Sequence, residues 1–454
     1  MTISTLLVAN RGEIAVRILR SAKDVGIRTV LAVSEIDQGS LAAEHADEVA
    51  VVGPAPAQAS YLNVQALVAA GKETGCDAVH PGYGFLSENA GFARGVQDAG
   101  MTWVGPAPDV IDLMGHKTRA LEAAIDAGVP VLPGSNGPLT GSDEDILDLA
   151  RSVGYPLVIK ASAGGGGRGI RLVSAEDDLL KTIDIARAEA SASFGDSTVY
   201  LERFVERARH VEVQIVGDGE TFLHLGDRDC SMQRRSQKII EEAPAPDLPD
   251  AVRQQIRESA VNLARLCQYT GVGTVEYLYD PVRHEAAFIE MNTRLQVEHP
   301  VTEFLTGVDL VAEQLEIAST GRTTLRQDSI GFDGHAIECR INAEDPDHNF
   351  QPSPGTITRL DWPQGEDYRI DTGVRTGDTV APYYDSLLAK LIVHGHDRQE
   401  AMRRMSDGLA ATHIEGIKTT VPLLKRLVTD SAFADVSHHT TYIETTMDST
   451  GSTS

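Results

Sequence analysis

The segment Glu290–Thr302 reads EMNTRLQVEHPVT, and it constrains the fold more than any other stretch of the chain. Its polar side chains recur at every second position, as they would along one face of a β-strand. They are Glu290, Asn292, Arg294, Gln296 and, near the end of the strand, Glu298. Burying such a face in an apolar core would be too costly, so it lies either at a solvated strand edge or in a ligand site. The oxygen atoms of Glu290 and Asn292 would suit a hard divalent cation.

The length and charge of the chain narrow the classes of function. A chain of 454 residues is too long for one compact core, so two to four domains are expected. The 66 acidic and 40 basic residues leave a net charge of −26, which argues against binding to nucleic acid or to an anionic membrane. The four scattered cysteines form no CxxC pair, and neither a signal peptide nor a membrane-length apolar run is present. These features predict a cytoplasmic protein without structural zinc.

Residues 1–115 alternate apolar strands with amphipathic helical patterns. This order predicts a parallel sheet covered by helices. Strands are expected at residues 5–9, 29–34, 48–52, 78–80 and 102–104. The first turn, NRGE, lacks the glycine fingerprint of dinucleotide-binding proteins, so no nicotinamide site is predicted. The loop HPGYGFLSEN at residues 80–89 follows a strand; it is either a ligand-binding loop or a tight connection.

A glycine-rich segment follows the apolar strand LVIKA at residues 157–161. The sequence SAGGGGRGIRLV differs from a Walker A motif, and a strand at residues 170–173 follows it. It therefore predicts a hairpin flap whose backbone N–H groups can close over a triphosphate. Lys160 and Lys117 are candidate phosphate ligands, although a lysine in an apolar strand can also extend from a sheet edge into water.

Two further strands bring acidic residues together. TVEYLYD at residues 274–280 and AFIEMN at residues 287–292 are joined by a turn, and antiparallel pairing would place Glu276 beside Glu290. Two adjacent carboxylates repel each other unless a cation lies between them. Magnesium is the usual partner of nucleoside triphosphates. The alternative is a pair of solvated surface glutamates.

A basic cluster precedes these strands in RDCSMQRRSQKIIEEAPAP, and it predicts an anion site. Its members are Arg228, Arg234, Arg235 and Lys238. Alternatively, these side chains pair with Glu241 and Glu242. His210 lies on an alternating strand, RHVEVQIVGD, and by itself favours a structural role.

Residues 331–447 predict a further mixed α and β unit. Arg340 lies on the expected strand HAIECRINAEDP, and YYDSLLAKLIV is another apolar strand. Helices are expected at residues 398–411 and 421–427. The small polar residues at 448–454 predict a disordered tail.

Taken together, these segments resemble biotin carboxylase, a member of the ATP-grasp superfamily, over residues 3–445. The motifs that carry the resemblance, in order along the chain, are ANRGEIAVRI, HPGYGFLSEN, MGHK, IKASAGGGGRGIR, RHVEVQ, RDCSMQRRSQK, EEAPAP, EMNTRLQVEHPVTE, HAIECRINAEDP, PSPGTIT and PYYDSLLAKLI. The resemblance implies an α/β and α+β fold in three parts. These are a doubly wound parallel-sheet domain at residues 1–115, an ATP-grasp domain at 116–330 with a glycine-rich lid at about 132–204, and a mixed α+β domain at 331–447.

The resemblance also implies roles for individual residues. The family's ATP contacts correspond to Lys117, Lys160, Gly166, Gly167, Glu202, Arg203, Phe204, Val205, His210, Gln233, Ser236, Glu276 and Glu290. Its metal ligands correspond to Glu276, Glu290 and Asn292, and its bicarbonate site to Lys238, Arg294 and the backbone N–H of Val297. Glu298 takes the place of the general base, and Arg340 that of the residue that stabilises the biotin enolate. Family members usually carry His where this chain has Ser236, so weaker ATP binding is expected.

The implied activity is ATP-dependent carboxylation of biotin by bicarbonate through carboxyphosphate. Mg2+, or Mn2+ in its place, would act with ATP, and biotin would arrive bound to a biotin carboxyl carrier protein or domain. A carboxyltransferase subunit would complete an acyl-CoA carboxylase of the kind used in fatty acid metabolism, although the final carboxyl acceptor is not encoded here. The family also implies a homodimer. Two alternatives stay open: an ATP-grasp ligase that activates another carboxylate, and a non-catalytic scaffold subunit.

Overall fold

The computed structural model describes residues 2–135, 137–161 and 169–450. Its N-terminal part is a parallel five-stranded sheet in the order β3-β2-β1-β4-β5, as the alternating pattern predicts. The strands are β1 (Thr5–Val8), β2 (Arg28–Ser34), β3 (Glu48–Gly53), β4 (Ala78–His80) and β5 (Thr102–Trp103). The main helices of this part are α1 (Gly12–Asp24), α2 (Leu41–His45), α3 (Val64–Glu73), α4 (Ala90–Asp98) and α5 (Pro108–Gly115). Because β1 and β4 are neighbours, the NRGE turn and the HPGYGF loop leave the same edge of the sheet.

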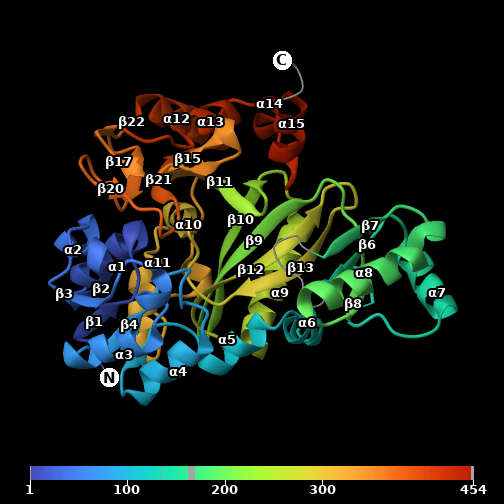
Figure 1. Ribbon diagram of the computed structural model, residues 1–454, viewed down its shortest axis with the longest axis horizontal. Coiled ribbons are helices and arrows are strands. Elements are labelled where there is room, and N and C mark those ends of the chain that lie inside the picture. The colour runs from blue at the N-terminus through green and yellow to red at the C-terminus, as the bar shows by residue number, and fades with distance from the viewer. Residues whose placement is uncertain (1, 136, 162–168, 451–454) are drawn as a thin grey trace.

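An antiparallel sheet of eight strands forms the centre of the molecule (Figure 1), in the order β13-β12-β9-β10-β11-β14-β21-β19. In chain order the strands are β9 (Arg209–Asp218), β10 (Phe222–Arg234), β11 (Gln237–Ala243), β12 (Thr270–Asp280), β13 (Glu285–Asn292), β14 (His335–Asn342), β19 (Tyr368–Thr372) and β21 (Leu387–Gly395). Since β11 pairs with β14, this sheet continues across the domain boundary expected at residue 330.

Helices cover this central sheet. The buried apolar residues of α9 (Asp250–Leu266) share a core with alternate residues of β9 and β12. The other helices associated with the central and C-terminal parts are α10 (His299–Thr306), α11 (Leu310–Thr320), α12 (Arg398–Ala411), α13 (Val421–Val428), α14 (Ser431–Ala434) and α15 (Tyr442–Thr450). Short strands complete the C-terminal part: β15 (Glu344–Asp345), β16 (Gln351–Pro352), β17 (Gly355–Thr356), β18 (Arg359–Asp361), β20 (Thr379–Val380) and β22 (His413–Glu415). Helix α15 extends into the segment for which a disordered tail was expected, and residues 451–454 lie outside the described part of the chain.

A separate three-stranded antiparallel sheet lies at one end of the molecule (Figure 1), in the order β7-β6-β8. Its strands are β6 (Leu157–Ala161), β7 (Ile170–Val173) and β8 (Val199–Arg203), and α7 (Asp143–Val153) and α8 (Leu179–Phe194) pack on it around their own core. Helix α6 (Lys117–Asp126) precedes this unit. The pairing of β6 with β7 confirms the predicted hairpin. Within the described residues, no helix is both long and apolar enough to cross a lipid bilayer.

Candidate active site

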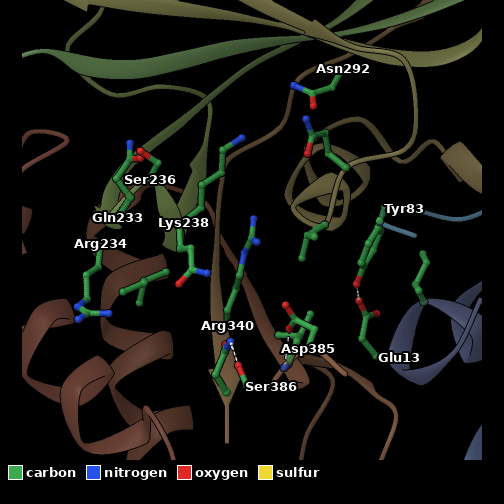
Figure 2. A pocket seen from close by; sticks show the side chains of 18 of the residues that line it. Glu13, Tyr83, Gln233, Arg234, Ser236, Lys238, Asn292, Arg340, Asp385 and Ser386 are labelled. Atoms are coloured by element: carbon green, nitrogen blue, oxygen red, sulfur yellow. Dashed lines mark hydrogen bonds between the residues drawn. The ribbon is translucent and has the colours of Figure 1, made fainter. Parts of the chain in front are cut away.

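A cavity of about 920 Å³ opens where the N-terminal sheet, the central sheet and the C-terminal strands meet. Its walls come from the NRGE turn, the HPGYGF loop, the β10–β11 hairpin, the β12–β13 hairpin, the segment after β13, strand β14 and residues 384–387. Figure 2 shows side chains from these elements directed into the same space. The HPGYGF loop is therefore more than a connection, because Tyr83, Gly84 and Phe85 line the cavity.

Three glutamates form a row across neighbouring strands beside this cavity. Glu276 on β12 lies opposite Glu290 on β13, which confirms the predicted pairing, and on its other side it lies opposite Glu212 on β9. Glu212 and Glu276 are buried, whereas the Glu290 side chain is exposed to the cavity. Loss of surrounding water, together with repulsion from Glu276 and Glu88, raises the pKa of Glu290.

Lys238 on β11 ties this row to Glu298. Its ammonium group lies 2.6 Å from Glu212 Oε2, 2.9 Å from Glu276 Oε1 and 2.6 Å from Glu298 Oε1. Burial alone would lower the pKa of Lys238, but the three carboxylates raise it well above its ordinary value. Lys238 is therefore a permanent cation at the floor of the cavity.

His210 on β9 is a second cation in this cluster. Its Nε2 atom lies 3.2 Å from Glu276 Oε2 and 3.5 Å from Glu212 Oε2. Burial acts to lower the pKa of His210, but the attraction of Glu276 outweighs it and raises the pKa to about 9. The histidine is therefore charged at neutral pH and contacts the glutamate row. The strand pattern alone had favoured a structural role for it.

Strand β13 ends at Asn292, so the strand predicted to carry the whole polar face is too long. The segment from Thr293 to Val297 is a loop, and Glu298 immediately precedes α10. Because β13 is the edge strand of the sheet, the chain is free to leave it, and Leu295 anchors the loop in the core shared with the N-terminal part. Glu290, Asn292, Arg294 and Gln296 nevertheless line the same cavity, whereas Glu298 is fully buried behind it and contacts the lining residues Lys238 and Arg340.

Arg294 is held in the cavity by groups from two parts of the molecule. Its Nε donates to Glu88 Oε2 at 2.8 Å, and its Nη2 donates to Asn292 Oδ1 at 2.9 Å. Glu88 belongs to the HPGYGFLSEN segment, which pointed to a ligand loop without identifying this contact. Its Nη1 donates to Gln296 Oε1 at 3.0 Å, so each nitrogen of the guanidinium has an acceptor, and the arginine is held in a fixed orientation beside the predicted metal ligands.

Glu298 lies between two cations. Its Oε1 accepts from Lys238, and its Oε2 accepts from Nη2 of Arg340 at 2.9 Å. Burial acts to raise the pKa of Glu298, but Lys238 and Arg340 lower it below its ordinary value despite repulsion from Glu212. The side chain is fully buried and ionised, so it is in the protonation state of a base. The Arg340 guanidinium also donates to Glu241, whose pKa burial raises to about 7.

The basic cluster of the sequence does not form one anion site. Arg228 is fully buried and pairs with Glu212, while Arg234 and Arg235 lie at the β10–β11 hairpin and contact Asn349. Arg228 and Lys238 both contact Glu212, but within this cluster Lys238 is the cation that also contacts Glu276 and Glu298. The alternative interpretation, in which these four basic residues form ion pairs with Glu241 and Glu242, is wrong. Glu241 pairs with Arg340, and Glu242 pairs with Arg398.

The remaining predicted ATP contacts fall into two groups. Gln233 and Ser236 line the cavity, whereas Lys117, Lys160 and the residues Glu202–Val205 do not. Lys160 on β6 pairs with Glu202 on β8 within the separate sheet. Gly166 and Gly167 lie outside the described residues.

The sequence reasoning did not identify several side chains of the cavity or its floor. Alternation in RHVEVQ places Glu212 on the same strand face as His210, a usable signal, but its pairing with Glu276 needed the β9–β12 register. Leu278 and Ile289 add an apolar wall beside Glu276 and Glu290, and no motif marked them. Such a wall suits a planar aromatic ring.

Glu276, Glu290 and Asn292 fit a divalent cation. All three line the cavity, and their side chains offer carboxylate and amide oxygen atoms. The raised pKa of Glu290, caused in part by repulsion from Glu276, reveals negative charge that a bound cation would offset.

Three family models together match nearly the whole chain. Residues 2–111 match the biotin carboxylase N-terminal domain, and residues 338–445 match the biotin carboxylase C-terminal domain. Residues 116–326 match the ATP-binding domain of the carbamoyl-phosphate synthase L chain.

Individual relatives agree with these models over nearly their full length. The chain is 50% identical to a biotin carboxylase of Pseudomonas aeruginosa over 440 residues, which is 97% of each chain. A crystal structure of biotin carboxylase from Campylobacter jejuni in complex with β,γ-ATP has a TM-score of 0.90 and 42% identity, covering 98% of this chain and 99% of that one. The biotin carboxylase domain dimer of Hydrogenobacter thermophilus 2-oxoglutarate carboxylase, in complex with MgADP, ADP and bicarbonate, has a TM-score of 0.88 and 44% identity, covering 98% of both chains.

Proposed function

The chain belongs to the biotin carboxylase family of ATP-grasp ligases, and we propose that the cavity described above is where it carboxylates biotin with ATP and bicarbonate. One observation carries this assignment. Lys238 and Arg340 both contact the ionised, buried carboxylate of Glu298, and the cavity that these two cations line is also lined by Arg294 and by the oxygen ligands Glu276 and Glu290. The matched relatives give no support for another carboxylate-activating ligase or for a scaffold subunit.

The nucleotide end of the cavity is assigned to the β10–β11 and β12–β13 hairpins. His210 and Lys238 supply positive charge for phosphate oxygen atoms, and Leu278 and Ile289 supply an apolar surface for the base. Magnesium, when bound, would be held by Glu276, Glu290 and Asn292 and would spread the charge of the transferring phosphoryl group. We assign Lys160, Gly166 and Gly167 to a lid at about residues 132–204 that covers the nucleotide, Glu202–Val205 to its hinge, and Lys117, which precedes the lid, to a further ATP contact. The separate β7-β6-β8 sheet supports a lid distinct from the rest of the chain. We place the end of the N-terminal domain near residue 115 and the start of the C-terminal domain near residue 331, although the central sheet continues across the second boundary.

Bicarbonate would bind between Lys238, Arg294 and the backbone N–H of Val297. Bicarbonate is a weak nucleophile, so it must be held in line with the γ-phosphate, and the two cations offset its repulsion with the triphosphate. Glu298 would remove the bicarbonate proton. The bicarbonate oxygen then attacks the γ-phosphorus, the bond to ADP breaks, and carboxyphosphate forms.

Biotin would bind beside Arg340. Carboxyphosphate releases CO2 and phosphate, the phosphate takes the proton of the biotin ureido nitrogen, and the nitrogen attacks CO2 to form the new N–C bond. The negative oxygen of the deprotonated ureido group needs a fixed cation, and Arg340 is held in place by Glu298 and Glu241.

Carboxybiotin must be delivered elsewhere, so we assign a biotin carboxyl carrier protein and a carboxyltransferase subunit as partners. A homodimer is the proposed assembly, supported by the dimer of the Hydrogenobacter thermophilus relative. The four cysteines are buried and unpaired, which supports work in a reducing compartment such as the cytoplasm.

Steady-state ATP hydrolysis tests this function. The purified chain should hydrolyse ATP only when Mg2+, bicarbonate and biotin are all present. Arg294→Ala should lower the rate by about 100-fold or more, because it removes a cation that screens the reacting anions. Arg322→Ala, which removes an exposed arginine paired with Glu220, is the control and should keep the full rate. A full rate in Arg294→Ala, or hydrolysis that ignores bicarbonate, would contradict the assignment.

A further inference from the structure

Lys390 is a fully buried lysine that does not line the cavity but joins three parts of the molecule behind it. It lies on β21 of the C-terminal part. Its ammonium group donates to the Val297 carbonyl oxygen at 2.8 Å and lies 3.2 Å from Glu13 Oε2 on helix α1. A third acidic group, Asp371 on the neighbouring strand β19, lies 3.8 Å away.

The contact with Val297 reaches the loop that holds the bicarbonate ligands. The carbonyl that Lys390 binds belongs to the peptide bond between Val297 and Glu298. The backbone N–H of Val297 is a proposed bicarbonate donor, and Glu298 is the proposed base. The ammonium group therefore holds the backbone that sets the positions of both.

The contact with Glu13 reaches the opposite wall of the cavity. Glu13 lies in the first turn of α1, and its Oε1 accepts a hydrogen bond from the Tyr83 hydroxyl, as Figure 2 shows. Tyr83 belongs to the HPGYGF loop and faces the same space as Arg340. Tight packing fixes Glu13 as well, since a Cβ on Gly373 would lie 2.5 Å from the Glu13 backbone nitrogen.

We propose that Lys390 is a positioning residue that couples the bicarbonate loop to the biotin side of the cavity, through Val297 on one side and Glu13 and Tyr83 on the other. This inference rests on the proposed function, since it presumes that both walls serve one reaction. A displacement of either loop would then be transmitted to the other through a single buried ammonium group.

The charge balance supports a fixed cation at this point. Burial acts to lower the pKa of Lys390, but Glu13, Glu338 and Asp371 raise it above its ordinary value. A buried ammonium group without such partners would be too costly to keep. Carboxylates in the N-terminal and C-terminal parts offset the cost of removing the ammonium group from water. The lysine is therefore held in place only when those two parts are packed together.

Lys390→Met is the direct test. This substitution keeps an unbranched chain but removes the donor to Val297 and the partner of Glu13. It should raise the KM for bicarbonate and the KM for biotin together, each by between about tenfold and 100-fold, while the KM for ATP changes less than about twofold. A rise in only one of the first two constants would overturn the coupling.

Glu13→Gln tests the coupling from the other end, and it decides the matter if Lys390→Met does not fold. The amide still accepts from Tyr83 but loses its charge, so measurements belong at pH 8, above the Glu13 pKa of about 7. Hydrogen exchange at residues 295–298 should become faster, because Glu13 is linked to this segment through Lys390, which donates to the Val297 carbonyl oxygen. Unchanged exchange there would overturn the proposal.

Arg398→Met is the matched control, since it also removes a cation from a buried carboxylate, Glu242, without reaching either loop. It should leave the KM for bicarbonate, the KM for biotin and the hydrogen exchange at residues 295–298 unchanged. A change like that expected for Lys390→Met would overturn the proposal.

The hydrogen-exchange measurement does not require the enzyme to turn over substrate, so it separates this proposal from the proposed function. Coupled exchange in a chain that lacks bicarbonate-dependent ATP hydrolysis would refute the proposed function alone, whereas normal hydrolysis without coupled exchange would refute the role of Lys390 alone.

Discussion

At the scale of single residues, Ser236 is the point where this cavity departs from the family pattern, in which histidine is usual. It lies in the turn between β10 and β11, with a backbone φ of 63°, and its side chain is exposed at the cavity wall. Figure 2 shows it near Gln233 on the side of the cavity away from Tyr83. A hydroxyl group can donate to a phosphate oxygen, but it is shorter than an imidazole and carries no charge.

Ser236→His should therefore strengthen ATP binding. Histidine is among the residues that tolerate a positive φ, and a hydrogen bond from a charged ring to phosphate predicts a KM for ATP that is lower by about tenfold. Ser236→Asn is the control, because it suits the turn but cannot carry a positive charge. Initial rates at varied ATP concentration measure the effect. An ATP affinity in Ser236→His equal to or weaker than wild type would count against this reading.

At the same scale, the sequence predicted Glu276 beside Glu290 because a short hairpin sets that register locally. Glu212 escaped prediction because its partner, Glu276, is more than 60 residues away along the chain. Arg228 was misread although its partner is nearer in the chain: Glu212 lies opposite it on the neighbouring strand β9, and the run of basic residues by itself does not reveal this pairing.

At the scale of secondary-structure elements, strand β11 separates two adjacent glutamates by sending them to opposite faces of the sheet. Glu241 contacts Arg340 at the active site, whereas Glu242 accepts from Arg398 and lies 2.8 Å from His335 Nε2. Burial acts to raise the pKa of Glu242, but His335 and Arg398 lower it to about 2. One strand thus holds Arg340 of the proposed active site on one face and a buried ion pair with Arg398 on the other.

The lowered pKa of Glu242 predicts a pH dependence of stability. A carboxylate with a pKa of about 2 in the folded state and an ordinary value of 4.5 stabilises the fold above pH 4.5, and this contribution is lost as the pH falls towards 2. The loss is on the order of 3 kcal/mol. Glu242→Gln should flatten the decline in unfolding free energy between pH 5 and pH 3, measured by urea denaturation. Glu176→Gln, in an exposed pair with Arg151, should leave the decline unchanged, and an equally steep decline in Glu242→Gln would refute the prediction.

At the scale of the whole molecule, the cavity exists only because three parts of the chain pack together. The eight-stranded sheet runs from β13 to β19 without a break at the expected boundary, and the N-terminal sheet supplies the opposite wall. A ligand in this cavity contacts all three parts, so its binding energy adds to the stability of the whole assembly.

Magnesium and ADP should therefore raise the thermal unfolding midpoint together. At a ligand concentration of 100 times the Kd, the added stability is about 2.7 kcal/mol. Chelation of Mg2+ should remove most of this gain in wild type. In Glu290→Gln, which removes a proposed metal ligand, ADP alone and MgADP should give nearly the same midpoint. A full magnesium-dependent shift in this variant would show that Glu290 does not hold the ion.

Local periodicity, short turns and the order of the motifs were enough to predict the parallel N-terminal sheet, the β6–β7 hairpin, the Glu276–Glu290 pair and the family. Three features became visible only in the folded chain: β13 stops at Asn292, Lys238 contacts three carboxylates, and Lys390 contacts groups behind both walls of the cavity. Each of these depends on contacts between residues far apart in the chain, and local sequence carries no information about which distant charge will neutralise a buried one.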